Sequence, residues 1–423
     1  MEIKEKYDLI VTGGGTSGVA AAVTAAQNGL KVLLIEKNSF LGGSMTGALV
    51  TPMMKNLLQD NNGFKNLILE KLTATGDSVN YQGDNPGWFN PEILKCVLDD
   101  VCLEAGVTVL FDTIVISADS FGQKVESVEC FNKSGRQYFG AKYFIDATGD
   151  ADLAALLKIP FEIGNYGQTQ PVSLRFNMAG INVEKLASWL ENYDPDREVT
   201  TIYRENGKTF LSTACTFDSG KSWKLRPLFE KALEKKILKY SDCKYFQIFS
   251  IPGQDGSIAF NCPRIDFPVN PLKADEISKA LIEGRKAIQR IANFCKEFLP
   301  GFENAYISTI ANNLGVRDSR RIKGKYCLKK EDLSRIMENP VAKSDYPFDI
   351  HSNSQDKSVL SQRAYYEIPL NSLLVNEFDN FLVVGRCISA DFLMQSSLRI
   401  QPNCIAMGES AGKYIVKKIK SFI

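Results

Sequence analysis

The chain has 423 residues and carries 50 Lys and Arg residues against 49 Asp and Glu residues, a formal net charge of +1. This balance excludes the strongly basic surface typical of nucleic-acid binding or of attachment to acidic membranes, and no run of about 18 uncharged apolar residues predicts a membrane span. The length exceeds what one hydrophobic core usually supports, so we expect two domains.

The first 36 residues follow the order strand, glycine turn, helix, strand, acid. Residues 7–12 form a largely apolar, β-branched run that predicts a strand, and residues 31–35 predict a second buried strand that ends at Glu36. Between them lie the turn Gly13-Gly14-Gly15-Thr16-Ser17-Gly18 and the small residues 19–28, which predict a helix. This is the context in which a GxGxxG motif binds a dinucleotide.

Each glycine of the motif has a mechanical reason. Gly13 permits the tight turn, Gly15 lets a pyrophosphate approach the backbone, and Gly18 lets the helix pack closely on the strand. The helix N-terminus then offers free N–H groups to the phosphates, and Glu36 stands where a carboxylate accepts hydrogen bonds from a ribose. The alternative is that the glycines serve only a tight strand–helix turn.

The residues after Glu36 favour FAD over a nicotinamide dinucleotide. Residues 37–47 form a loop rich in glycine and hydroxyl groups, which suits a cofactor that continues well past its pyrophosphate. A second GxGxxG motif is absent from the sequence, so we expect no dedicated NAD domain. An apolar strand at 143–146 leads into the small-residue turn Ala147-Thr148-Gly149-Asp150.

The remaining elements alternate between strands and helices. Asn90-Pro91-Glu92 is typical of a helix start and predicts a helix that runs to about Ala105. Further strands are predicted at 107–111, 113–116, 125–131, 172–178, 257–262 and 380–384, and further helices at 226–239, at 274–298 and from Pro402 onward. We expect residues 1–160 and 301–423 to form one discontinuous domain, interrupted by residues 161–300 as a substrate cap, with ligand bound between the two.

The motifs in combination resemble the FAD-dependent oxidoreductases of the glutathione-reductase structural group. More narrowly, they resemble the branch that includes the flavoprotein subunit of heterodisulfide reductase. The resemblance covers residues 1–50, about 105–155 and about 305–423. The motifs that carry it are the GxGxxG turn with Glu36, Gly42-Gly43, Ala147–Asp150, Gly315–Ile322, Gly385–Asp391 and Ser397–Pro402. It implies an α/β fold, in which a Rossmann-like FAD-binding domain (a parallel sheet with helices plus a small antiparallel β-meander) is interrupted by an α+β substrate cap domain.

The resemblance also implies where non-covalent FAD would bind. The pyrophosphate would lie at Gly13, Gly15, Thr16, Ser17 and Gly18, the adenosine ribose at Glu36 and Lys37, and adenine beside Val115, Ala147, Thr148 and Gly149. Gly43 and Ser44 would lie near the phosphates or ribityl chain, Gly385 and Arg386 at the ribityl turn, and Ile400 and Gln401 near the flavin. Many relatives carry Asp where this chain has Arg386, so Asp391 is the alternative partner of the ribityl chain.

The cysteine pattern differs from that of the disulfide reductases and from that of flavoproteins with iron–sulfur clusters. Residues 41–55 lack the redox cysteine pair of the disulfide reductases, and the ten cysteines of the chain include no CxxC pair, which argues against an iron–sulfur cluster or another metal site. We expect reduced, mostly buried thiols. The chain starts at once with the nucleotide-binding strand, which leaves no room for a secretory signal, so we expect a cytoplasmic protein.

Four residues are the candidates for catalysis. Arg317 and Arg320 would clamp a substrate carboxylate or face the flavin; the alternative is that they pair with acids and organise the domain junction. Arg399 is either a flavin or substrate contact or a plain surface charge, and His351 is either a general acid–base or a solvated loop residue.

The expected function is hydride transfer between a small organic substrate and the N5 atom of FAD. One alternative is an electron-transfer subunit that passes electrons to an iron–sulfur or thiol partner protein. Another is a flavin-binding sensor without enzymatic activity. A long chain with its own cap domain argues against the sensor, whereas the resemblance keeps the electron-transfer alternative open.

Overall fold

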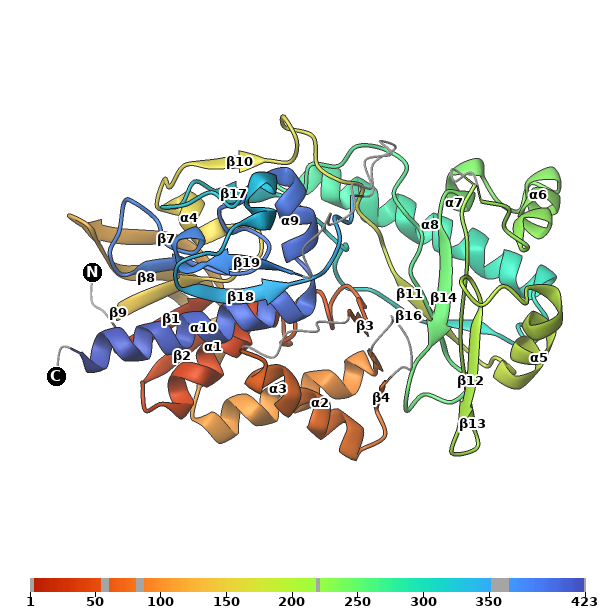
Figure 1. Cartoon of the computed structure of the whole chain (residues 1–423), viewed down its shortest axis with the longest axis horizontal. Coiled ribbons are helices and arrows are strands. Elements are labelled where there is room, and N and C mark those ends of the chain that lie inside the picture. The colour runs from red at the N-terminus through yellow and green to blue at the C-terminus, as the bar shows by residue number, and fades with distance from the viewer. Residues whose placement is uncertain (1–3, 55–60, 81–86, 218–220, 351–364, 422–423) are drawn as a thin grey trace.

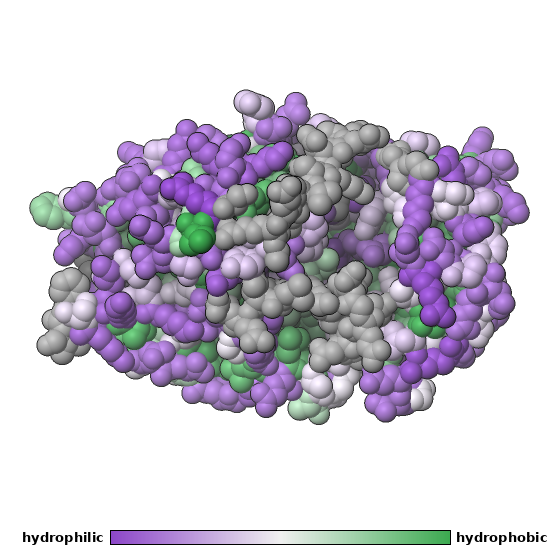
Figure 2. All heavy atoms as spheres, viewed as in Figure 1, coloured by the Kyte–Doolittle hydropathy of each residue, from purple (hydrophilic) through white to green (hydrophobic). Residues whose placement is uncertain are grey.

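The structure, a computed structural model, describes residues 4–54, 61–80, 87–217, 221–350 and 365–421. Figure 1 shows two halves side by side, one built on a mostly parallel sheet with two long helices and the other on an antiparallel sheet. Figure 2 shows hydrophilic side chains over most of the visible face, with hydrophobic side chains in separate small groups.

The first half centres on a seven-stranded sheet. Its parallel strands follow the order β6 (Thr108–Leu110), β2 (Val32–Ile35), β1 (Glu5–Thr12), β9 (Gly135–Asp146) and β20 (Phe381–Val383). β7 (Ile114–Phe121) and β8 (Lys124–Asn132) extend it from the first part of β9 as an antiparallel meander. The predicted Rossmann-like α/β fold with a meander is therefore confirmed.

Local sequence signals determine the first helices. α1 (Thr16–Gln27) follows the glycine turn and buries ten of its twelve residues, because small side chains let it lie close to the sheet and to its neighbours. α3 (Pro91–Ala105) begins at Asn90, whose side chain accepts a hydrogen bond from the Glu92 N–H at 3.1 Å, and ends at Gly106, which has φ 78°. Both ends of α3 lie where the sequence predicts them.

The last helix packs on the first with their backbones in contact. α10 (Gln401–Lys420) carries Gly408 and Gly412 on the side that faces α1. A Cβ atom at Gly408 would lie 2.1 Å from the Ser17 carbonyl oxygen, and one at Gly412 would lie 2.7 Å from that of Ala21. This contact brings the glycine turn before α1 and the segment Arg399–Ile400 before α10 close together.

The second half contains a six-stranded antiparallel sheet and four helices (Figure 1). The strand order is β12 (Thr201–Glu205), β13 (Lys208–Cys215), β14 (Phe246–Ser250), β15 (Ile258–Phe260), β11 (Phe176–Ala179) and β16 (Tyr306–Ile310). The helices are α5 (Val183–Tyr193), α6 (Arg226–Glu234), α7 (Tyr240–Cys243) and α8 (Ala274–Phe298). Aromatic rings pack in the core between them, with ring centroids 4.2 Å apart for the stacked pair Phe176 and Phe260 and 4.3 Å apart for the tilted pair Phe229 and Phe294.

Smaller elements surround the two sheets. They are α2 (Gly63–Ala74), α4 (Asp152–Leu156), α9 (Phe392–Leu398), β3 (Pro52–Met53), β4 (Ser78–Asn80), β5 (Gly87–Phe89), β10 (Phe161–Ile163), β17 (Arg320–Ile322), β18 (Pro340–Ser344) and β19 (Tyr366–Pro369), with short 3-10 helices at Lys330–Ser334 and Leu370–Ser372. β10 pairs with β17, and β16 pairs with β11, so hydrogen bonds link residues on both sides of the predicted boundaries at 160 and 300. Those boundaries stay a prediction.

Two predicted elements lack four or more of the residues expected at one end. α6 ends at Glu234 rather than 239, because Lys236 adopts a left-handed φ of 59° that closes the helix. β11 begins at Phe176 rather than 172, since Ser173 instead forms isolated bridges with two other segments.

We expect the α1–α10 contact to be sensitive to a single side chain. Gly408→Val should lower the free energy of unfolding by about 2 kcal/mol or more, because the new Cβ would meet backbone that cannot move aside. Urea unfolding followed by circular dichroism measures this change. Lys417→Ala on the exposed side of α10 is the matched control, and equal effects of the two variants would contradict the contact.

Candidate functional site

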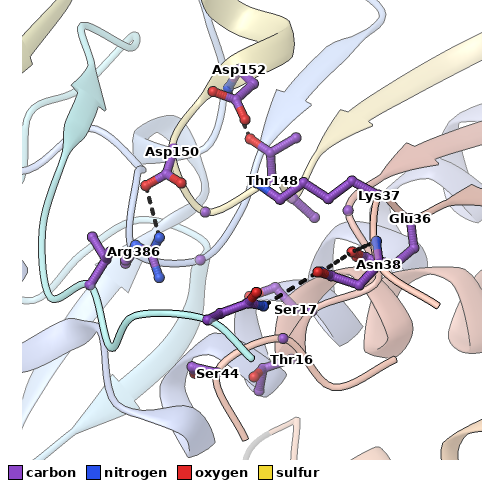
Figure 3. Close-up of a pocket in the computed structure, with 18 of the residues that line it drawn as sticks. Thr16, Ser17, Glu36, Lys37, Asn38, Ser44, Thr148, Asp150, Asp152 and Arg386 are labelled. Carbon is purple, nitrogen blue, oxygen red and sulfur yellow. Dashed lines mark hydrogen bonds and ion pairs between the residues drawn. The ribbon is translucent and has the colours of Figure 1, made fainter. Parts of the chain in front are cut away.

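A cavity of about 390 Å³ opens at the carboxyl ends of the parallel strands and continues toward the antiparallel half. At one end it is lined by the glycine turn, by the residues after β2 and by the turn after β9 (Figure 3). At the other end it is lined by Arg399, Gln401 and Cys404 around the start of α10, and by Ile277 and Leu281 of α8. Ligands of open α/β sheets bind at this edge.

The glycines of the turn occupy three different environments. A Cβ atom at Gly13, which has φ +97°, would lie 2.5 Å from the Ala147 carbonyl oxygen, and one at Gly18 would lie 1.8 Å from that of Gly13. A Cβ atom at Gly15 would have no protein atom closer than Gly43 Cα at 3.8 Å. Gly13 and Gly18 are therefore required by the fold itself, whereas Gly15 keeps free a space that belongs to the cavity.

The N-terminus of α1 points its free backbone N–H groups at this space. Gly15 is the N-cap residue, and no side chain caps the helix there. The first turn of α1 contains no acidic residue, so its N–H groups and the positive end of the helix dipole are available to an anion. This is a cradle of the size and charge that a pyrophosphate needs.

Glu36 lies at the end of β2 with its carboxylate buried against the cavity wall. Its two oxygens accept hydrogen bonds from the Gly14 N–H at 2.6 Å and the Asn38 N–H at 2.8 Å, and Asn38 Nδ2 donates a further one at 2.5 Å. Figure 3 shows Glu36 and Asn38 side by side at the cavity. The carboxylate is thereby held in one orientation, with lone pairs left for the hydroxyl groups of a ribose.

The turn after β9 is held by a buried acid. Asp146 accepts hydrogen bonds from the Thr148 N–H at 3.0 Å, the Thr148 hydroxyl at 2.7 Å and the Ala154 N–H at 2.8 Å. Burial raises the pKa of the Asp146 carboxyl to about 6. These bonds place Ala147 and Gly149 along the wall of the cavity.

Arg386 and Asp150 form an ion pair across the cavity wall, with 2.8 Å between Arg386 Nη2 and Asp150 Oδ1 (Figure 3). Burial opposes ionisation of Asp150, but the Arg386 charge and a hydrogen bond from Ser319 outweigh it, so the pKa of this carboxyl lies below its ordinary value. The same pairing raises the pKa of Arg386 despite its burial. The pair fixes Arg386 where the sequence places the ribityl turn.

Three polar atoms of the cavity wall are buried without a hydrogen-bond partner among the described residues. They are Arg386 Nε, Arg399 Nε and Gln401 Oε1. Buried polar groups of this kind are normally satisfied by water or by a ligand. Together with the space at Gly15, they show that the residues present fit an extended polar cofactor.

Most of the cofactor residues expected from the sequence meet at this cavity. Those that line it are Gly13, Gly15, Thr16, Ser17, Glu36, Lys37, Gly43, Ser44, Val115, Ala147, Thr148, Gly149, Gly385, Arg386 and Gln401, and the catalytic candidate Arg399 lines it too. Gly18 and Ile400 lie directly behind the lining, in α1 and at the N-cap of α10. His351 lies outside the described residues.

Two candidates have other partners. Arg320 donates to the Asp150 carbonyl and to the Asp152 carboxylate, both at 2.8 Å, which favours the reading that it organises the junction. Asp391 accepts from the Met394 N–H at 2.7 Å as the N-cap of α9 and from the Lys330 N–H at 2.9 Å, outside the cavity lining. Its contacts therefore favour a capping role over a ribityl contact.

Sequence reasoning missed Arg175, Arg264 and Tyr245, which lie close enough to Arg317 to interact electrostatically with it. Arg175 is only 9% exposed and donates from Nη1 to the Leu49 carbonyl at 3.2 Å. The Arg264 guanidinium lies 4.0 Å from the ring centroid of Tyr245. Residues 172–178 alternate apolar and polar side chains, so the sequence predicts that Arg175 faces solvent and carries no signal for its burial.

The cysteines near the cavity are protonated. All ten cysteines are free thiols and eight are buried. Burial raises the pKa of Cys404 to about 11 and that of Cys387 well above its ordinary value, which favours spectator thiols. In the part of the chain that the structure describes, no group of three His, Cys, Asp or Glu side chains is placed to hold a metal ion, and no helix has the length and apolar character to cross a membrane.

Comparison with known proteins supports this reading of the site. A family profile described as FAD dependent oxidoreductase matches residues 8–421. Thiamine thiazole synthase of Methanococcus vannielii is 27% identical over 169 residues, which cover 36% of this chain and 60% of that protein. The mitochondrial dihydrolipoyl dehydrogenase of Schizosaccharomyces pombe is 30% identical over 154 residues, which cover 34% of this chain and 28% of that protein. The matches thus span less than two thirds of these relatives.

A solved structure shows the same fold over the whole chain. The p-nitrophenol 4-monooxygenase of Pseudomonas putida DLL-E4 aligns with 100% of this chain and 82% of its own, with a TM-score of 0.54 and 11% sequence identity. At this identity the likeness concerns the fold alone. The narrower resemblance to the glutathione-reductase group and its heterodisulfide-reductase branch stays a prediction.

Gly15→Val should abolish retention of FAD while leaving the protein folded, because the new side chain meets the cavity and not the protein. Gly18→Val is the matched variant, and it should fail to fold because its Cβ would collide with the Gly13 carbonyl. Absorbance at flavin wavelengths after desalting, with circular dichroism, distinguishes the two. If a folded Gly15→Val protein still carried stoichiometric FAD, the cofactor would have to bind elsewhere in the protein.

Glu36→Gln should weaken FAD binding by roughly 1.5–3 kcal/mol, because it keeps the shape of the side chain but removes the charged acceptor. Titration of the apoprotein with FAD, followed by flavin fluorescence, measures the change. The effect should be smaller than that of Gly15→Val. Unchanged affinity would show that the carboxylate does not contact the ribose.

Proposed function

Because the chain belongs to the FAD-dependent oxidoreductase family, we propose that FAD binds non-covalently along the cavity, with its pyrophosphate at the N-terminus of α1. The observation that carries this proposal is the space kept free at Gly15 beside uncapped N–H groups. Glu36 and Lys37 would hold the adenosine ribose, and Val115 and Thr148 would flank adenine. Gly43, Ser44 and Arg386 would follow the ribityl chain.

The flavin end would then lie at the start of α10. Pro402 stands in the first turn and has no N–H, so the N–H groups of Gln401 and Asn403 are the unpaired ones expected there. They would point at the pyrimidine part of the ring, where the positive end of the helix dipole stabilises negative charge. Gln401 is already held by a hydrogen bond from its Nε2 to the Val50 carbonyl at 2.6 Å.

When bound, FAD supplies the redox chemistry, exchanging a hydride at its N5 atom with a small organic substrate. The chain supplies position and exclusion of water. Arg399 is oriented by Asp349, with 2.9 Å between Nη2 and Oδ2, and it reaches the cavity from the first half. Ile277 and Leu281 of α8 cover the cavity from the antiparallel half, so substrate would be enclosed between the two halves.

The proposal predicts a yellow protein whose flavin bands persist through desalting. In an anaerobic cuvette, the flavin should bleach with dithionite and with one class of a substrate panel that includes hydroxy acids, amines and unsaturated compounds. Protein that is colourless and gains no flavin absorbance after incubation with FAD would overturn the proposal. Reduction only in the presence of an iron–sulfur or thiol protein would instead support the electron-transfer alternative.

A further inference from the structure

Four arginine side chains gather beside the flavin end of the cavity. We call them the arginine group: Arg175, Arg264, Arg317 and Arg399. Three of them come from neighbouring segments joined at Ser173, which forms β-bridges with Arg264 and with Gly315 and lies two residues before Arg175. Arg399 approaches from the other half of the molecule, just before α10. Segments far apart in the sequence thus place four positive charges together.

The arginine group adjoins the cavity at three points. Arg399 itself lines the cavity, and Arg317 directly follows the lining residue Val316. Arg175 donates to the carbonyl of Leu49, which directly follows the lining residue Ala48. Since the glycine turn lies at the opposite end, the phosphates of FAD are not what these charges would neutralise.

Two members of the group have no ion pair with any residue that the structure describes. Asp349 pairs with Arg399, and Asp318 accepts a hydrogen bond from the Gln170 N–H at 2.7 Å while lying near Arg321 and Arg399. Among the described residues, Arg175 and Arg317 therefore have no carboxylate partner of their own. Burial, followed by the positive charges of Arg264 and Arg399, lowers the pKa of Arg317, as expected where like charges are held together.

Within the described part of the chain, the contacts of Arg175, Arg317 and Arg399 leave some of their donors open. Arg317 Nη1 donates to the Pro171 carbonyl, and Arg175 Nη1 donates to the Leu49 carbonyl, so each of these guanidinium groups is anchored by a neutral acceptor. Arg399 Nε has no partner among the described residues. Guanidinium groups anchored at one nitrogen present the others in a fixed fork that matches a carboxylate or phosphate.

We propose that the substrate is a small organic acid with at least two anionic groups, bound by the arginine group against the flavin. This inference rests on the proposed function, which places the flavin at the start of α10. Two anionic groups suit the geometry because Arg399 and the set of Arg175, Arg264 and Arg317 come from opposite halves. A dianion would bridge them and offset the surplus of positive charge.

The first test uses the wild-type holoprotein and a panel of non-reacting probes. Succinate and malonate should raise the unfolding temperature and shift the visible flavin spectrum, with saturation at millimolar concentration or below. Butyrate should bind at least about tenfold more weakly, and the neutral dimethyl succinate should have no effect. Equal responses to dimethyl succinate and succinate would overturn the inference. A response to glycerol 1-phosphate, which carries one phosphate group, without a response to succinate or malonate would also overturn it.

The second test removes single charges. Arg175→Met and Arg317→Met should each weaken binding of the best probe by about 10- to 100-fold while FAD stays bound. Arg204→Met is the matched control, since Arg204 belongs to the same half but pairs with Glu184 and Glu191 on the surface. If these variants leave probe affinity unchanged but alter the flavin reduction potential, the arginine group serves the flavin and the inference is wrong.

The two proposals fail in different ways. Protein that retains no FAD overturns the proposed function whatever the probes do. Protein that retains FAD, bleaches with dithionite and shows no response to any dianion overturns only the substrate class. Should a methionine variant fail to fold, the wild-type probe panel still decides the inference.

Discussion

The N-terminus of α1 is held in place by close contacts on three sides, two of them with backbone. Gly18 lies against the Gly13 carbonyl, Gly408 of α10 lies against the Ser17 carbonyl, and a Cβ atom at Gly385 would lie 2.9 Å from the Ser17 hydroxyl oxygen. Because only the short side chain of Ser17 takes part in these contacts, the helix end cannot shift without moving β1, α10 or the turn after β20. Its N–H groups are therefore fixed toward the cavity before any ligand binds.

The two ends of the cavity differ in how their charged side chains are paired. Along the turn after β9 the buried charges have protein partners, as with Asp150 and Arg386 or with Asp146 and its three donors. A preorganised wall of this kind orients a cofactor that stays bound. Near the start of α10, Arg175 and Arg317 form no ion pair with a described residue, and this is where we propose that an anionic substrate binds. On that proposal, permanent and exchangeable ligands are separated along one cavity.

The sequence predicts those features that short-range rules determine. The glycine turn, the Asn90 cap and the ends of α8 follow from residues within a few positions of one another. The pairing of β10 with β17 joins residues more than 150 positions apart, and no local pattern specifies it. The same holds for the bond between the Lys330 N–H and the Asp391 carboxylate, 61 positions apart, which adds to the local cap on α9 and holds this side chain outside the cavity lining.

Arg175 shows most clearly why the substrate end escapes sequence reasoning. Its neighbours Leu174 and Phe176 are fully buried in the core of the antiparallel half, so the local pattern reads as an ordinary core strand. Only the bridges at Ser173 and the contact with Leu49 reveal that this strand ends at the cavity. The cofactor end is built from backbone groups and glycines, and few other residue types fit at those glycine positions. The substrate end is built from side chains on separate segments, which can be exchanged one at a time without disturbing the cradle at α1. Substrate choice can therefore change within this fold while the binding of FAD is preserved.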